Sequence, residues 1–314
     1  MPNPLTKLVT PRYPSAAVGL EHRSASVVEL ERIRGGGARI RRAANVGLDD
    51  SILQPGFAEL NIPNPTVLAN TLTELAASAG LLKQKRWSLS LPEESIRTAI
   101  ITLETTPGSS NELEDILSWK IERTIGLPLT ELTLTRERLP ADPQGRARYL
   151  IAAARSEVIA EYEAIFASLG WRAGLLLPRH LGEAQWLSSN GARSDSLLLS
   201  SCEQGFTALV VRGGEPLILR KVLCDATDRE DELYRLLLFY RERRSKENSE
   251  VLSRLLVLGE DFSRARVAEI TNETLGTDLR PLGAEDLGLE IPSRELSFDV
   301  LAGPAGLAKL SLNQ

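Results

Sequence analysis

The sequence predicts an α/β protein of two lobes, with a small α+β unit inserted in the first lobe. Two observations lead to this fold class. A pattern of strand, polar tip, strand, glycine-rich turn and strand occurs twice, near residues 16–46 and 196–222, which indicates a duplicated unit. Between the two copies, residues 93–171 follow the order strand, helix, strand, strand, helix. A chain of 314 residues is also longer than one ordinary hydrophobic core requires.

The first lobe is expected to comprise residues 16–92 and 172–194, preceded by a flexible leader of residues 1–15 that is polar and rich in proline. Alternating apolar residues predict its strands, and a period near 3.6 predicts its helices. The expected elements are strands at 16–20, 25–33, 38–46 and 86–91, and helices at 66–80 and 181–187.

The inserted unit, residues 93–171, has the clearest helix signals. Asn111 is a good N-cap with Glu114 three residues later, and Gly126 followed by Pro128 ends the helix. The apolar run 96–103 and the segments 132–139 and 149–154 are expected to be strands, and 156–169 a second helix on the unit's own core.

The second lobe is expected to comprise residues 195–314. It repeats the opening pattern of the first lobe and then adds a long helix and a buried strand. Its expected elements are strands at 196–200, 206–211, 217–222 and 255–259, and helices at 228–244 and 262–275.

Charge and composition exclude several classes of function. The net charge of -5 and the interspersed arginines give no sign of a nucleic-acid binder. The basic cluster at 241–246 is interpreted as a solvated loop, with anionic lipid or an acidic partner as the alternative. The two cysteines fit a reducing cytoplasm. No apolar run approaches the ~20 residues that span a bilayer, so any membrane attachment is expected to come through a partner.

Single residues offer few candidates for chemistry. His22 and His180 are isolated, so no metal site is expected. His22 and Arg23 are interpreted as an exposed polar tip, with a phosphate contact as the alternative. Cys202 has no histidine at a catalytic spacing, which favours an inert thiol.

Two lobes that each open with such a hairpin are typical of the actin-like (ribonuclease H-like) ATPase fold. Within that fold, the middle block resembles the type IV pilus assembly protein PilM family. The resemblance runs over nearly the whole chain from about residue 16. It is carried by the segments 19–30, 111–128, 149–155, 233–244, 254–260 and 303–309, in this order.

The resemblance implies a site for ATP and magnesium between the lobes, but three loops depart from the family's pattern. The departures remove loop glycines and aspartates that would approach phosphate and hold the cation. The altered positions are Gly19, Glu21, His22, Arg23 and Ser24 in the first loop, Ser201, Cys202, Glu203 and Gly205 in the second, and Gly259 and Glu260 in the third. We therefore expect a pseudo-ATPase with no catalytic residues, no metal and no cofactor.

Membership of this family would imply a cytoplasmic scaffold at the inner membrane, working with other pilus platform and motor components. Its partner would be the cytoplasmic tail of a PilN-like bitopic membrane protein, held between the first lobe and the inserted unit. Trp119, Leu132 and Leu134 are candidates for contacting that tail, although Trp119 could instead pack beside Ile116. Trp87 and Trp186 are expected in the core.

Two other functions stay open on the sequence. One is an active actin-fold ATPase, small-molecule kinase or nucleotide-regulated switch, which would bind magnesium and nucleotide. The other is a cytoplasmic component of a type II secretion system. That component normally carries its own transmembrane helix, and the sequence shows none.

Overall fold

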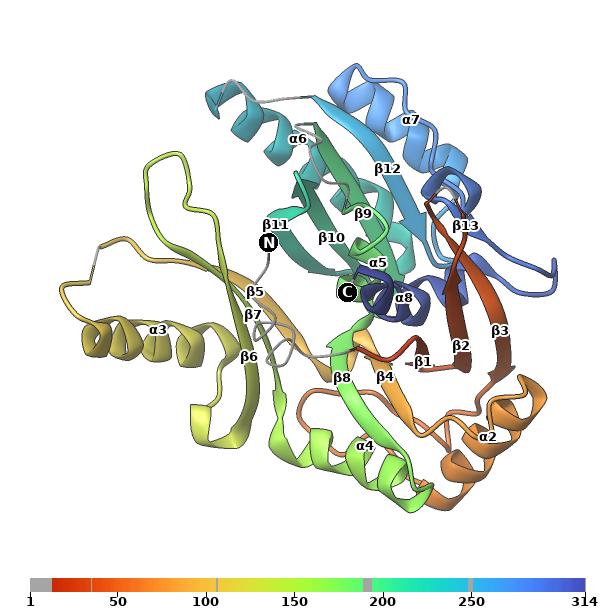
Figure 1. The fold of residues 1–314 in the computed structure, drawn as a ribbon. Helices are drawn as coiled ribbons and strands as arrows, with labels where there is room; N and C mark the ends of the chain where they lie inside the picture. The colour runs from red at the N-terminus through yellow and green to blue at the C-terminus, as the bar shows by residue number, and fades with distance from the viewer. Residues whose placement is uncertain (1–12, 35, 106, 189–193, 248–250, 314) are drawn as a thin grey trace.

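The computed structural model describes residues 13–34, 36–105, 107–188, 194–247 and 251–313. Most of the expected leader, residues 1–12, lies outside these ranges. Two sheet-centred lobes stand side by side, and a smaller sheet extends from one flank (Figure 1). Among the helices that the structure describes, none combines the length and the apolar character needed to cross a bilayer.

The first lobe is built on a six-stranded sheet of order β13-β3-β2-β1-β4-β8. Strands β1, β2 and β3 form an antiparallel meander, whereas β4 and β8 continue the sheet parallel to β1. The bounds are β1 (Ala16–Glu21), β2 (Ser24–Arg32), β3 (Ala38–Gly47), β4 (Arg86–Leu91), β8 (Arg172–Pro178) and β13 (Leu289–Glu290). The helices α2 (Pro65–Ser78) and α4 (Ser156–Ser168) cover one face of this sheet.

The second lobe is built on a four-stranded sheet of order β11-β10-β9-β12. The order and directions match β3-β2-β1-β4 of the first sheet, so the predicted repeat is confirmed. The bounds are β9 (Asp195–Cys202), β10 (Gly205–Arg212), β11 (Glu215–Leu223), β12 (Leu252–Leu258), α6 (Arg229–Glu247) and α7 (Arg264–Leu275). Helices α6 and α7 cover its outer face.

Two helices lie between the sheets and join the lobes. These are α5 (Arg179–Ala184) and α8 (Phe298–Lys309). Their apolar side chains share one core cluster with residues of both sheets, including Val28 of β2 and Leu256 of β12. The lobes therefore share a buried core as well as a boundary.

The inserted unit is a three-stranded antiparallel sheet of order β5-β7-β6 with α3 on one face. Its bounds are β5 (Arg97–Thr102), α3 (Ser110–Ile125), β6 (Leu132–Leu139) and β7 (Arg148–Arg155). Gly126 ends α3 in the left-handed region with φ of 81°, as predicted. The N-cap is Ser109, whose Oγ accepts the Glu112 amide at 3.2 Å, so the expected cap at Asn111 is wrong by two residues.

Three parts of the chain differ from the expectation. Helix α4 packs its Tyr162 and Phe166 into the first-lobe core, not into the core of the inserted unit. Strand β13 and helix α8, expected in the second lobe, lie on the first sheet. An apolar helix face predicts burial but not which sheet covers it. The predicted boundaries at 93 and 171 stay a prediction.

Candidate functional site: the cleft between the lobes

The three altered loops meet in one cleft of about 1050 Å³ between the two lobes. The tip of the β1–β2 hairpin lines it from the first lobe, and the tip of the β9–β10 hairpin faces it from the second. The loop that follows β12 contributes Gly259 and Glu260. Gly19 and Gly205 lie within β1 and β10 and do not line the cleft.

The cleft forms where parallel strands end. Strands β1, β4 and β8 run in the same direction, so their carboxyl ends reach one edge of the first sheet. Glu21 ends β1, Glu93 follows β4 in a short 3-10 helix, and Arg179 follows β8. Neither Glu93 nor Arg179 belongs to a recognisable motif in the sequence. The signal that could have identified them is their place as charged residues directly after a buried strand.

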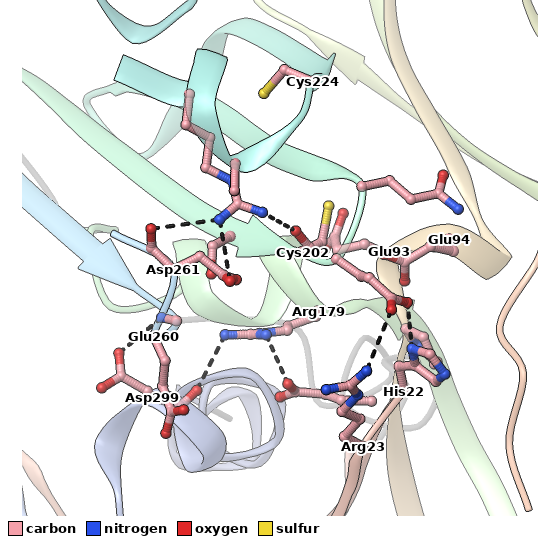
Figure 2. Close-up of a pocket in the computed structure, with 18 of the residues that line it drawn as sticks. His22, Arg23, Glu93, Glu94, Arg179, Cys202, Cys224, Glu260, Asp261 and Asp299 are labelled. Carbon is pink, nitrogen blue, oxygen red and sulfur yellow. Dashed lines mark hydrogen bonds and ion pairs between the residues drawn. The ribbon is translucent and has the colours of Figure 1, made fainter. Parts of the chain in front are cut away.

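The two hairpin tips contact each other through opposite charges. His22 Nδ1 of the first tip contacts the Glu203 carboxylate of the second. Arg23 lies 3.8 Å from the same carboxylate, and His22 Nε2 lies 3.4 Å from Asp50. Figure 2 shows His22 and Arg23 directed into the cleft. The tips thus engage each other across the cleft.

Arg179 pairs with the acid at the end of β1. Its guanidinium Nη1 donates to Glu21 Oε2 at 2.9 Å, and its Nε donates to Glu183 Oε1 at 2.5 Å. Burial raises the pKa of Glu21 to about 7, because the positive charge of Arg179 offsets burial only in part and the negative charge of Glu183 adds to the rise. One cation thus serves two acids, and Glu21 holds a proton part of the time near neutral pH.

A second buried network crosses the cleft floor. The carboxylate of Glu93 accepts from the His180 amide at 2.8 Å and from Thr207 Oγ1 at 3.1 Å, and the His180 ring lies 2.8 Å away. Burial alone would raise the pKa of Glu93, but the charge and hydrogen bonds of His180, helped by Lys221, lower it to about 2. Since Thr207 belongs to β10, this network ties the lobes together.

The third loop packs on the second tip. Gly259 has φ of 95°, and a Cβ at this position would lie 1.8 Å from Ser201 Oγ, so only glycine fits. Its amide donates to Asp299 Oδ1 at 2.9 Å, and Arg264 Nη2 donates to the same carboxylate at 2.8 Å. Packing against Ser201 and the hydrogen bond to Asp299 therefore account for a glycine at position 259 without any ligand.

The thiol of Cys202 is unreactive in this setting. Burial, together with the charges of Glu94 and Glu93, raises its pKa to about 12. A thiol with such a pKa stays protonated at neutral pH and is a poor nucleophile.

Four carboxylates of the cleft pair with basic side chains of the protein. Glu21 pairs with Arg179, Glu203 with Arg23, and Asp299 with Arg264, and Asp261 pairs with Arg229 at 3.1 Å. Within the described residues, no group of three histidine, cysteine or carboxylate side chains could hold a metal ion. A cation would have to displace arginines from these acids.

Of the three candidates for contact with a partner, one is exposed and two pack in a core. Trp119 is 56% exposed on α3, with Arg123 over its ring at 5.3 Å, so the alternative that it packs beside Ile116 is wrong. Leu132 and Leu134 instead pack into the core of the inserted unit. Their alternation along β6 turns both toward α3, which corrects the view of them as open contacts.

The remaining tryptophans lie in cores. Trp87 and Trp186 are buried, as predicted. Trp171 is buried too, with its ring centroid 4.9 Å from that of Trp87.

Comparison with known proteins gives a result at the level of the fold. No protein-family model and no curated protein matches the sequence. A chain of a PilM–PilN type IV pilus biogenesis complex superposes with a TM-score of 0.70 at 18% identity, over 96% of this chain and 98% of the other.

Two further solved structures are more distant. The cytoplasmic domain of EpsL, an inner membrane component of the type II secretion system of Vibrio cholerae, has a TM-score of 0.49 at 10% identity, over 95% of this chain and 94% of the other. A Bacteroides thetaiotaomicron protein with an actin-like ATPase fold has a TM-score of 0.47 at 12% identity, over 96% and 97%. The chain thus has the two-lobed actin-like fold that it shares with a chain of the PilM–PilN complex.

Proposed function

We propose that this protein is a PilM-like scaffold of a type IV pilus or related secretion machine. In this role it binds the cytoplasmic tail of a PilN-like bitopic membrane protein at the inner membrane and does not hydrolyse ATP. The fold likeness to a chain of a PilM–PilN complex, which extends over 96% of this chain, supports the assignment.

The ion pairing of the two hairpin tips is the observation that carries the non-enzymatic part of the proposal. His22 and Arg23 meet Glu203 across the cleft. Positive charge that would attract phosphate is thereby neutralised by the opposite lobe.

Further contacts hold the lobes and the inserted unit as one frame. Arg148 Nη2 at the start of β7 donates to the Leu217 carbonyl of β11 at 2.9 Å. Lys221 Nζ of β11 donates to the Glu93 carbonyl at 2.9 Å. A fixed frame suits a scaffold, because an enzyme of this architecture must open its lobes to exchange nucleotide.

The junction of the first lobe and the inserted unit offers a place for an extended tail. Arg97 of β5 lies over the Phe57 ring at 4.1 Å, and Arg155 Nη1 donates to the Ala58 carbonyl at 2.6 Å. Leu60, which follows Ala58 by two residues in the same loop, is 60% exposed. In the sheets that the structure describes, β6 pairs only with β7, so its outer edge can accept an added strand.

Calorimetric titration with a synthetic tail peptide tests this proposal. The peptide is taken from the bitopic membrane protein of the same genome. We expect a dissociation constant in the micromolar range, which corresponds to a binding free energy of about -8 kcal/mol. The Leu60→Asp variant should bind the peptide more weakly. Leu82→Asp is the matched control, because Leu82 is 54% exposed in a first-lobe turn after α2. No binding by the unaltered protein, or equal loss in both variants, would contradict the proposal.

A further inference from the structure

A second hollow of about 590 Å³, here called the basic pocket, lies at the turn between β2 and β3. Three cationic side chains line it: Arg32 at the end of β2, Arg34 of the turn and Lys309 at the end of α8. Ile33 and Leu312 add apolar surface. No carboxylate is among the described residues that line it, although the chain as a whole has a net charge of -5.

The cations of the basic pocket have neutral partners or none. Lys309 Nζ donates to the Gln185 carbonyl at 2.8 Å and lies 4.7 Å from the Trp186 ring centre. In the part of the chain that the structure describes, Arg32 and Arg34 form no ion pair and no side-chain hydrogen bond. Burial and the nearby charge of Arg254 lower the pKa of Lys309. The positive charge at this end of α8 is therefore uncompensated.

Arginines on the adjacent strand β3 show the opposite situation. Arg39 Nε donates to Glu290 at 2.6 Å, and Arg41 and Arg42 each lie within ion-pair distance of Glu29. These side chains are solvated pairs of the usual kind. The concentration of unpaired cations in the neighbouring hollow is a local feature, not a property of the whole face.

The basic pocket is separate from the cleft between the lobes. Strand β2 begins at the cleft with Ser24 and ends at the pocket with Arg32. At ~3.3 Å per residue, its length places the two sites roughly 27 Å apart. A ligand in the basic pocket therefore would not touch the hairpin tips.

We propose that the basic pocket binds a phosphate group, carried either by a phospholipid headgroup or by a small soluble molecule. Guanidinium groups match the geometry of phosphate oxygens, and two arginines with a lysine can surround one anion. The apolar Ile33 and Leu312 would contact the carbon skeleton next to the phosphate. Such binding would add a contact that does not depend on the protein partner.

Two probes distinguish the sources of the phosphate group. Vesicles of equal parts phosphatidylglycerol and phosphatidylcholine are used in cosedimentation, and glycerol 1-phosphate is used in calorimetric titration. Vesicle binding that soluble glycerol 1-phosphate competes away identifies a lipid headgroup. Binding of glycerol 1-phosphate without vesicle binding identifies a soluble ligand. Failure of both probes to bind would overturn the proposal.

Matched variants test the location. We expect the Arg32→Ala, Arg34→Ala double variant to weaken binding at least about tenfold, because it removes two of the three cations. Both side chains are exposed, so the fold should persist, which an unchanged unfolding midpoint verifies. The control is Arg138→Ala with Arg294→Ala, which removes equal charge from exposed positions elsewhere. Equal weakening by the control would show non-specific charge attraction and overturn the proposal.

Discussion

The β1–β2 hairpin of the first lobe and the β9–β10 hairpin of the second have the same geometry and opposite charge. Glu21 pairs with Ser24 in the first, and Cys202 pairs with Gly205 in the second, which leaves two residues at each tip. Each hairpin continues into an antiparallel third strand and has a parallel strand on its other side. The first tip is His-Arg, whereas the second is Glu-Gln.

Under the proposed function, this difference means that the same backbone framework is kept while the residues at its tips serve another use. Packing of the two sheets determines where the tips lie, and two residues at each tip determine what they can bind. Tips that both face a nucleotide need donors for phosphate and acids for its cation. Tips of opposite charge attract each other and need no ligand between them.

The largest loss of stability is expected when Arg179, the ion-pair partner of Glu21 at the first hairpin, is replaced. Arg179→Met leaves Glu21 and Glu183 without their cation, and a stranded buried charge should cost about 4 to 5 kcal/mol of unfolding free energy. Urea denaturation measures the change. Adding Glu183→Gln to the variant should restore part of the loss. A fully stable Arg179→Met protein would show that the first hairpin does not depend on this pairing.

The second largest loss of stability is expected at Glu93, which accepts a hydrogen bond from Thr207 of the second hairpin. Glu93→Gln should cost about 2 to 3 kcal/mol near neutral pH, because it removes the charge that His180 and Thr207 contact. The pKa of Glu93 is lowered to about 2, so this stability is present above about 4.5 and is lost as pH falls toward 2.

Urea denaturation at several pH values checks this prediction, and Glu94→Gln on the adjacent residue is the control. A loss that did not shrink with acid, or an equal loss in the control, would argue against a charged Glu93.

Glu21 should show the opposite pH dependence. Its pKa is raised from 4.5 to about 7, so the favourable contribution is full below 4.5 and is lost as pH rises through 7. Glu21→Gln should therefore be more stable than the unaltered protein at pH above 7, by about 1 to 2 kcal/mol, and comparable near pH 5. Parallel denaturation curves at the two pH values test this. A constant difference would mean that Arg179 keeps Glu21 fully ionised.

The smallest loss of stability is expected for substitutions at the hairpin tips. Glu203 and Arg23 are 50% and 73% exposed in their side chains, so Glu203→Gln should cost less than about 1 kcal/mol. Faster hydrogen exchange of the tip amides should accompany it. Glu260→Gln, on the same cleft rim and without an ion pair in the described residues, should change neither quantity. Equal exchange in both variants would show that the tips are not held together by Glu203.

The sequence predicted much of the fold because the hairpins and most helices carry local signals. It missed β8, whose glycine at 174 interrupts the strand pattern, and α8, which contains Pro304 between two glycines. Those glycines allow close approach, since a Cβ at Gly306 would lie 1.8 Å from the Gly182 carbonyl oxygen. The glycines that allow α8 to pack closely are therefore residues that, in a sequence, normally predict the end of a helix.

The cleft could be predicted only in part. The tips were visible as polar turns between strands, but the pairing of His22 with Glu203 joins residues 181 positions apart. Arg179 and Glu93 come together only because β4 and β8 are parallel neighbours. Such neighbours depend on the topology of the sheet, which no local pattern specifies.

Under the proposed function, the hairpin tips engage each other in place of a nucleotide. Calorimetric titration of the full chain with magnesium and ATP tests this engagement, and binding of the tail peptide by the same preparation verifies that the protein is folded. We predict no measurable heat of nucleotide binding and no release of phosphate. Binding of ATP with a micromolar dissociation constant, or phosphate release that Glu21→Gln abolishes, would show that a nucleotide still occupies the cleft.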